Sequence, residues 1–437
     1  MDANTIIALL GIVAAIVAFS VLSYKGVHTY ISVIVAGFIV IVTSSLDPTV
    51  SFNETFWPNF NALLNQLWWL CIGGALFGAV VNLTGAGVVC GRAILKIMGK
   101  HATLGLAIVG VVLQLCGVSI FSGALFAMLP MIFAVFKEYD IPRRFAPAII
   151  CFSVLTLACV MPGSIATHNL LTTQFFGLTL YAGAVNGFVS FFVMLFLGDF
   201  IINKLIKKAK ANGEHFEALP GDFPAENADG EKKEPPLWRV LIPMVMFPVV
   251  INFAPWDMFF SQLIVFGVSL ICLWGYWTPK TLIASLREVV PMSLNVILGM
   301  AAITGFGSFI FASPAFKVII GLVMQIPGNA LVSAAIATTI LAGACGSASS
   351  AISIVLPVLG ETWAATGITT AGLARVVGLS SLVLDSLPHN GAINGLLMGC
   401  REPLKKAYPP IFWMTVVVPA IGTVLLIVLF SIFPNLP

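Results

Sequence analysis

Residues 122–130, Ser-Gly-Ala-Leu-Phe-Ala-Met-Leu-Pro, return in the second half of the chain at 349–357 as Ser-Ser-Ala-Ile-Ser-Ile-Val-Leu-Pro. Further along, Pro162 precedes a Leu-Leu pair at the same spacing at which Pro388 precedes another. Matches of Ala, Leu and Ser arise easily by chance, but prolines that agree in order and spacing do not. The two stretches therefore indicate an internal repeat, and a repeated unit sets the fold of the whole chain.

The composition is that of a membrane protein. Of 437 residues, 59% are hydrophobic and 9% are charged, whereas a soluble domain carries about 25% charged residues. Apolar runs of about 20 residues, which span a bilayer core, recur along the chain. The 39 glycines and 25 prolines are tolerated in such helices where the freed backbone groups line protein or water. The chain begins Met-Asp-Ala-Asn with no basic residue, so we expect the first run to be a retained span and not a cleaved signal.

In each half the apolar runs predict three spans, a hairpin of two short pieces, a span broken at a proline and a final span. The hairpin pieces meet at 117–123 and at 343–350, and the breaks fall at Met161-Pro162-Gly163 and Leu387-Pro388-His389. A loop is expected at 312–330. The predicted organisation is a first repeat at 1–200, a polar cytoplasmic linker at 201–238 and a second repeat at 239–437.

The distribution of basic residues predicts the orientation. If both hairpins enter and leave on the same side, 19 of the 21 Lys and Arg residues fall on that side, leaving Lys317 and Arg375 on the other. Basic loops face the cytoplasm. Five full crossings per half is an odd number, so the second repeat is expected to be inverted and both termini to be external. The predicted fold class is thus an all-α polytopic protein of the inner membrane with two inverted-topology repeats, which is typical of secondary transporters.

One carboxylate stands out within a predicted span. Asp385 lies just before the second break, and ionisable groups in spans are costly and mostly functional. Its equivalent in the first repeat is Cys159, so it does not follow the repeat. A substrate contact can occur twice in such a protein, whereas a proton site need occur only once. We therefore expect Asp385 to carry the coupling proton, with His389 as a relay or a donor to a carboxylate.

The other candidates are polar or small residues at the breaks and hairpin tips. A broken helix exposes N–H groups that favour an anion, and hydroxyl groups suit its oxygen atoms. Small residues at hairpin tips allow close approach, although they are also common at helix packing interfaces. The predicted substrate-binding residues are Ser119, Ser122, Gly123, Ser164, His168, Asn169, Ser347, Ser349, Ser350, His389, Asn390 and Asn394.

The residues at the breaks and the second hairpin resemble those of the gluconate:proton symporter family, within the larger ion transporter superfamily. The resemblance rests on Met161 to Ser164 with Gln174 to Gly177, on Gly343 to Pro357, and above all on Leu384 to Ala392. It implies proton-coupled uptake of small hydroxy monocarboxylates such as gluconate or 3-hydroxybutyrate, and an elevator-type homodimer. The run Thr-His-Asn at 167–169 departs from the Gln-rich run of relatives and leaves the substrate open.

Several alternatives remain at this stage. A sodium-coupled carrier of the same fold is the nearest, because hairpin carbonyls could hold sodium in place of the proton. An intramembrane enzyme using Ser349 or His389, or a channel, fits less well, because the polar residues follow the repeat. The sequence has no nucleotide-binding loop that would support ATP coupling, and no Cys or His spacing typical of a metal site. No cofactor and no nucleic acid is expected; the expected partners are the carboxylate and the bilayer.

Overall fold

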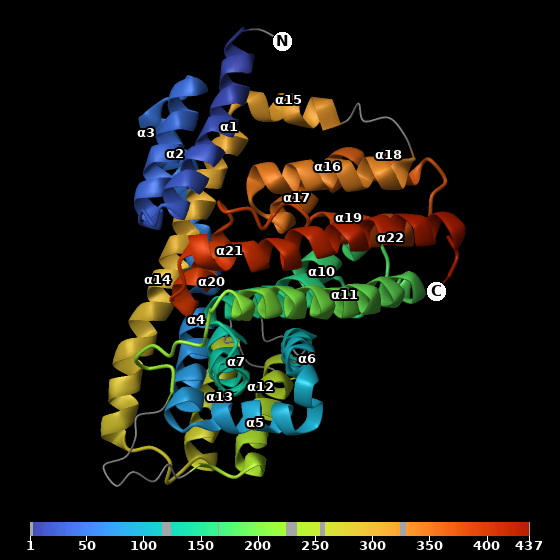
Figure 1. Ribbon diagram of the computed structural model, residues 1–437. Coiled ribbons are helices and arrows are strands. Elements are labelled where there is room, and N and C mark those ends of the chain that lie inside the picture. The colour runs from blue at the N-terminus through green and yellow to red at the C-terminus, as the bar shows by residue number, and fades with distance from the viewer. Residues whose placement is uncertain are drawn as a thin grey trace.

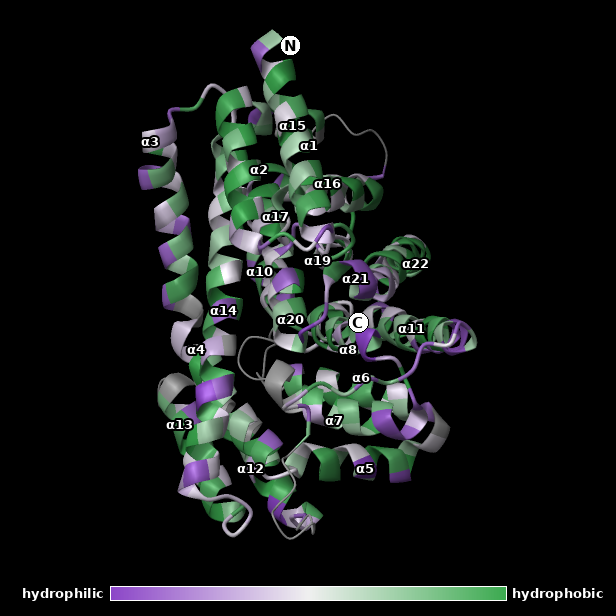
Figure 2. Cartoon of the chain, turned by 60° about the vertical axis from the view of Figure 1, so that its left-hand side comes forward, coloured by the Kyte–Doolittle hydropathy of each residue, from purple (hydrophilic) through white to green (hydrophobic). Residues whose placement is uncertain are grey.

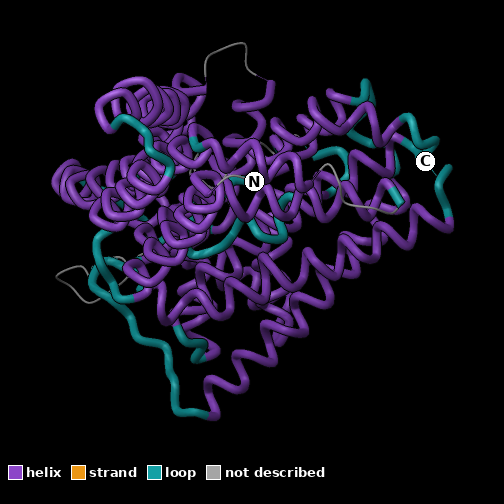
Figure 3. The backbone as a smooth tube through the Cα atoms, turned by 90° about the horizontal axis from the view of Figure 1, so that it is seen from above, coloured by secondary structure: helices purple, strands orange, loops and turns teal. Residues whose placement is uncertain are grey.

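The computed structural model describes residues 3–115, 124–164, 166–223, 234–253, 258–323 and 329–436. Every regular element within these ranges is a helix (Figure 3), which confirms the all-helical class. By length and composition, five helical stretches of this part of the chain could cross a membrane: Ala3–Tyr24, Arg143–Val160, Ala184–Ala211, Pro279–Ala312 and Leu404–Ile432. The bent pair Cys71–Leu83 and Ala86–Met98 could add a sixth.

Six helices run roughly in one direction and form one side of the molecule, here called the wall (Figure 1). They are α1 (Ala3–Tyr24), α2 (Thr29–Thr43), α4 (Trp57–Leu83), α12 (Leu237–Phe253), α13 (Met258–Cys272) and α14 (Pro279–Ala312). The short α3 (Pro48–Val50) and η1 (Ser51–Phe56) lead into α4. The pair α4 and α14, one helix from each half, has the most extensive contact in the fold.

A second group of helices, here called the bundle, lies beside the wall. It comprises α6 (Ala102–Leu115), α7 (Ala124–Tyr139), α8 (Ala146–Ile150), α9 (Ala158–Val160), α10 (Thr167–Phe175), α11 (Ala184–Ala211), α16 (Ala330–Cys345), α17 (Ala348–Val355), α18 (Glu361–Ala364), α19 (Thr370–Ser380), α20 (Gly391–Cys400), α21 (Leu404–Phe412) and α22 (Val418–Ile432). Short 3-10 helices, η2 (Gly99–His101) and η4 (Arg143–Phe145), lead into α6 and α8. Short π-helices, η5 (Cys151–Leu157), η6 (Leu356–Gly360) and η7 (Trp413–Val417), continue helices of the bundle. The long helices α11 and α22 pack together and run crosswise to α14 (Figure 1).

Two crosswise helices follow the central wall pair. The first, α5 (Ala86–Met98), turns by 73° from α4, and the second, α15 (Pro314–Val323), follows α14 at the opposite end of the wall (Figure 1). Small residues on α5 face α7, where a Cβ on Gly87 would lie 2.4 Å from the Cβ of Pro130. The prediction of a loop at 312–330 is wrong for residues 314–323. Proline can occupy the first turn of a helix, so Pro314 starts α15 instead of preventing it.

Apolar side chains cover the outside of both groups. On α1, Leu10 and Val13 are exposed, and on α22 Val424 and Val428 are exposed. Figure 2 shows hydrophobic residues along α1, α2 and α22. Exposed apolar surface on this scale is unfavourable in water and is the expected surface for lipid contact.

The two halves of the chain share one core in the bundle. The Asn186 side chain on α11 donates to the carbonyl of Phe433 at 3.0 Å, and the Ser190 hydroxyl donates to the carbonyl of Gly422 at 3.3 Å. Thr156 of the first half donates to the carbonyl of Met414 in the second. Neither half therefore satisfies its own buried polar groups alone.

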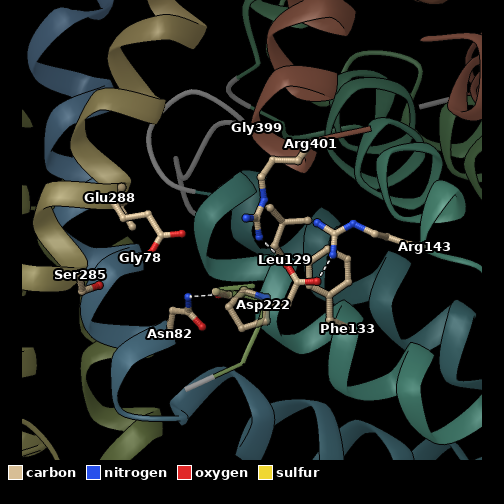
Figure 4. Close-up of a pocket in the computed structure, with 13 residues that line it drawn as sticks. Gly78, Asn82, Leu129, Phe133, Arg143, Asp222, Ser285, Glu288, Gly399 and Arg401 are labelled. Carbon is tan, nitrogen blue, oxygen red and sulfur yellow. Dashed lines mark hydrogen bonds and ion pairs between the residues drawn. The ribbon is translucent and has the colours of Figure 1, made fainter. Parts of the chain in front are cut away.

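After α11, residues 212–223 fold back onto the bundle, and we call this segment the strap. Figure 4 shows its Asp222 beside Arg143 and Arg401. The carboxylate of Asp222 is almost fully buried and pairs with two guanidinium groups, those of Arg143 and Arg401, the latter at 2.6 Å. Arg143 also lies 3.1 Å from the Glu402 carboxylate and stacks on the ring of Phe133. The buried positive charges are thus balanced by carboxylates from the strap and from the α20–α21 turn.

The strap also touches the wall. Asn82 at the end of α4 donates to the carbonyl of Gly221 at 3.0 Å. Gly221 has a φ of +86°, and a Cβ there would lie 2.6 Å from a carboxylate oxygen of Glu288 on α14. Only glycine fits this conformation and this contact without a shift. The strap therefore bridges the wall and the bundle.

We expect Asp222→Ala to destabilise the fold by about 3 kcal/mol, because Arg143 and Arg401 would lose a buried carboxylate partner. The measurement is chemical or thermal unfolding of the purified protein in detergent. The matched control is Glu234→Ala, which breaks the exposed Arg92–Glu234 pair and should cost less than about 1 kcal/mol. Equal effects of the two substitutions would contradict the prediction.

Candidate functional site

Both predicted helix breaks are confirmed. In the first, α9 ends at Val160 and α10 begins at Thr167; Gly163 between them has a φ of +84° and its N–H donates to the carbonyl of Leu180 at 3.0 Å. In the second, α19 ends at Ser380 and turns continue to Asn390, whose side chain caps α20 by accepting from the N–H of Ile393 at 2.8 Å. Pro162 lies two residues after the end of α9 and cannot continue it. The second break is longer than predicted, because α19 already ends at Ser380, eight residues before Pro388.

The second predicted hairpin tip is also confirmed. Helix α16 ends at Cys345 and α17 begins at Ala348, with Gly346 and Ser347 between them. Gly346 has a φ of +60°, and a Cβ there would lie 2.7 Å from Cδ2 of His389. Ser347 caps α17, and its hydroxyl lies within 3.3 Å of the Ser349 hydroxyl. A small residue is therefore required where the tip meets the second break.

A cavity of about 400 Å³ lies where these elements meet. Three helices begin at its lining, namely α10, α17 and α20. The positive end of the helix dipole lies at each of these starts, and the first N–H groups have no partner within the helix, although Ser347 and Asn390 each cap one of them. The wall supplies Leu63 from α4 and Met300 and Thr304 from α14, so the cavity lies between the wall and the bundle.

Asp385 is the acidic residue of this lining. Its carboxylate accepts from the Ser386 hydroxyl at 2.7 Å and interacts with the backbone N–H of Ala348, the first residue of α17. Cys159, its equivalent in the proposed repeat, lines the same cavity. The single carboxylate therefore lies at one of the three positive helix ends.

His389 and its neighbours tie the second break to the hairpin. Nε2 of His389 lies 3.0 Å from the carbonyl oxygen of Gly343, so this nitrogen carries the proton and donates. The Asn390 amide donates to the carbonyl of Gly346 at 3.0 Å, and the Asn394 amide donates to the carbonyl of Pro388 at 2.7 Å. These side chains hold the starts of α17 and α20 in place beside the cavity.

Arg375 performs a similar task at the first break. This buried residue of α19 donates to the side chain of Asn169 at 2.8 Å and to the backbone carbonyls of Leu180 and Ala182. Asn169 in turn donates to the carbonyl of Ser164 at 2.8 Å. The basic-residue count assigned Arg375 to the outer side without a role; in the structure it clamps the start of α10 from the other half of the chain.

The predicted site residues fall into three groups. Five line the cavity: His168, Ser347, Ser349, Asp385 and Asn390. Five lie behind the lining and hydrogen-bond the elements that form it: Ser164, Asn169, Ser350, His389 and Asn394. The remaining three, Ser119, Ser122 and Gly123, lie outside the described residues.

Sequence reasoning missed Gln114, Thr167, Thr304 and Ser386, which also line the cavity. Gln114 is the last polar residue of an otherwise apolar stretch of α6. A side-chain amide within a predicted span, like a charged group there, is costly without a polar partner and therefore marks a candidate functional residue. That signal could have identified Gln114, whereas Thr304 and Ser386 carry no such signal.

The chain is similar to known permeases and transporters. The sequence model of the GntP family permeases matches residues 5–255. A curated relative, the uncharacterized transporter YxjC of Bacillus subtilis, is 26% identical over 447 aligned positions, which cover 90% of this chain and 93% of that protein. Among solved structures, the YdaH transporter of Alcanivorax borkumensis matches with a TM-score of 0.43 and 15% identity, over 86% of this chain and 89% of that one.

We expect Gly346→Ala to destabilise the protein by about 1–2 kcal/mol from the left-handed backbone alone, with a further loss as His389 is displaced. Unfolding in detergent measures the effect. The matched control is Gly267→Ala on α13, where a Cβ meets nothing within 4 Å and alanine favours the helix, so stability should be unchanged or slightly higher. A neutral Gly346→Ala would show that the tip does not need glycine.

Proposed function

The chain belongs to the GntP permease family, and from this premise we propose that it is a proton-coupled symporter of small organic anions. Its family and relatives are permeases and transporters, so it is a multi-pass membrane transporter and not an enzyme. The observation that carries the proposal is the convergence of three helix starts and one carboxylate on a single cavity.

We propose that the two halves are inverted repeats and that the protein works by alternating access. The order of elements supports this: a helix pair, a long wall helix, a crosswise helix, a hairpin, a broken helix and a final helix occur in each half. The cavity lies between the wall and the bundle, so movement of the bundle along the wall would expose it to either side. An elevator-type homodimer, with basic loops and linker on the cytoplasmic side of the inner membrane, completes the proposal.

The chemistry of the cavity favours an anion with hydroxyl groups. A substrate carboxylate can accept from the N–H groups that the caps leave unbonded at the starts of α10, α17 and α20, where the helix dipoles also favour negative charge. The hydroxyls of Ser347 and Ser349 can donate to its oxygen atoms or accept from its hydroxyl groups. Hydroxy monocarboxylates of the gluconate or 3-hydroxybutyrate type meet these requirements.

Asp385 provides a means of coupling. It lies at the start of α17, so its negative charge and that of a substrate would occupy one small cavity and repel each other. Protonation of Asp385 removes this repulsion, and substrate and proton then bind together. His389 donates from Nε2 to a carbonyl and retains Nδ1 as an acceptor, which suits a relay. Sodium held by hairpin carbonyls is the alternative coupling ion.

We expect Asp385→Asn to abolish accumulation driven by a pH gradient while retaining exchange of bound substrate, because asparagine imitates the protonated acid. The measurement is uptake and counterflow of labelled 3-hydroxybutyrate and gluconate in proteoliposomes. The control is Glu361→Gln, which removes an exposed carboxylate at the start of α18 and should leave both activities unchanged.

Retention of full gradient-driven uptake by Asp385→Asn would remove Asp385 from the mechanism. Accumulation driven by a sodium gradient alone would overturn proton coupling in favour of the alternative. If the wild-type protein carried no organic anion from a panel of hydroxy acids, the substrate class itself would be wrong.

A further inference from the structure

A buried arginine joins the two broken helices. Arg375 on α19 is 4% exposed, and its side chain donates hydrogen bonds to the first half of the chain. Its Nε donates to the carbonyl of Ala182 at 2.8 Å, one Nη to Oδ1 of Asn169 at 2.8 Å, and the other Nη to the carbonyl of Leu180 at 2.6 Å. The Leu180 carbonyl also accepts from the N–H of Gly163 in the first break. One guanidinium therefore holds the break, the start of α10 and the turn before α11.

A tie of this kind does not require a charge. At the second break, the neutral amides of Asn390 and Asn394 hold the turn by donating to backbone carbonyls. The acceptors of Arg375 are neutral as well, an amide oxygen and two carbonyls, so these three bonds do not compensate the positive charge of the guanidinium. A buried cation is costly, whereas an amide would make the tie without that cost. The charge at the first break therefore suggests a role beyond the tie.

The helix that Arg375 holds forms part of the cavity. Residues 166–168, at the start of α10, line it, and Asn169 is the next residue of the helix. The side chain of Asn169 is fixed at both ends, because its Oδ1 accepts from Arg375 and its Nδ2 donates to the carbonyl of Ser164 at 2.8 Å. Arg375 is not part of the lining itself, so a change at Arg375 reaches the cavity through Asn169 and α10.

The start of α10 differs from the other two helix starts at the cavity. Ser347 caps α17 and Asn390 caps α20, each by accepting from an N–H of the first turn. Asp385 interacts with a further N–H of α17. The residue at the cap position of α10 is Ala166, whose side chain has no acceptor. A substrate carboxylate therefore meets less competition at the start of α10 than at the other two.

We propose that Arg375 is a positioning residue for the transported anion: through Asn169 it fixes the start of α10 and adds positive charge there, so that the substrate carboxylate binds at α10. This assignment rests on the proposed transport function and deepens it, because it names the part of the cavity that binds the carboxylate. The rest of the substrate then extends toward α17 and Asp385. Separation of the two carboxylates within the cavity also reduces their repulsion.

The test measures KM and maximal rate separately. Exchange of labelled 3-hydroxybutyrate and of gluconate is followed in proteoliposomes that contain equal amounts of folded wild-type or variant protein. Arg375→Met should raise the KM of the transported acid at least about tenfold and change the maximal rate less than about twofold, because the charge and the clamp act on binding. Arg375→Lys keeps the charge but cannot make three planar hydrogen bonds at once, so its KM should lie between those of wild type and Arg375→Met.

A second variant tests the same idea with Arg375 in place. Asn169→Asp keeps the size of the side chain and gives the guanidinium a carboxylate partner, so this protein should fold even if Arg375→Met does not. Its new negative charge neutralises Arg375 in the first turn of α10, and the donor to the Ser164 carbonyl is lost. The KM of the transported acid should again rise at least about tenfold.

The matched control is Asn186→Leu. Asn186 is also a buried asparagine in the first turn of a helix, and its amide joins the two halves by donating to the carbonyl of Phe433. It does not line the cavity and makes none of the hydrogen bonds of Arg375 described above. The substitution should lower the stability of the protein in detergent and leave the KM unchanged.

Two outcomes would overturn the proposal while leaving the transport function intact. An unchanged KM in folded Asn169→Asp protein would show that the substrate carboxylate does not depend on the charge at the start of α10. Equal increases of KM in Asn169→Asp and Asn186→Leu would show that KM follows the stability of the bundle, and would assign Arg375 to structure alone. Absence of transport of every acid by the wild type would instead refute the transport function, and the role of Arg375 would be refuted with it.

Discussion

A membrane interior offers no water to the backbone, so a helix can be broken there only where the protein itself surrounds the break. Most of this structure follows from that constraint. The interruptions near residues 161–166 and 381–390 free N–H and C=O groups that need partners, and Asn169, Asn390, Asn394 and Arg375 supply them. The N–H groups that remain at the helix starts face the cavity, where an anion can meet them. Structural support and ligand recognition therefore have one physical origin.

The sequence predicted the features that depend on local chemistry. Pro162 cannot continue a helix and the Gly-Ser tip at 346–347 suits a sharp turn, so the first break and the second tip were found where expected. The second break includes the predicted residues 387–389 but already begins after Ser380. The helix at 314–323 was missed because the sequence of a short apolar stretch between prolines is compatible with a loop as well as with a helix. Asp385 was identified because a charge in a span is rare, and the structure places it on the cavity lining, although its role is still a prediction.

Features that depend on distant pairing were beyond the sequence. The partners of Arg375 are an asparagine and two backbone carbonyls from the other half of the chain, and none has a charge that would mark it. The composition of the strap predicted a polar surface segment, yet its Asp222 is buried against Arg143 and Arg401. Likewise, Ser164 and His389 were expected to touch substrate, but both hydrogen-bond the backbone behind the lining. Residue type indicated where polar atoms would gather, and only the packing distinguishes a lining atom from a supporting one.

If the bundle moves along the wall as proposed, the strap limits how far it can travel. Its ion pairs attach it to the bundle, through Arg143 and Arg401, whereas the hydrogen bond that joins it to the wall among the described residues is the neutral contact from Asn82. During a transport cycle the hydrogen bond from Asn82 would break before the ion pairs, and the strap would move together with the bundle. The chain returns to the wall at α12, and Glu234 just before it pairs with Arg92 of α5. Phe223 and Glu234 are eleven residues apart along the chain and so can never be separated by more than roughly 40 Å, which would set an upper bound on the proposed movement.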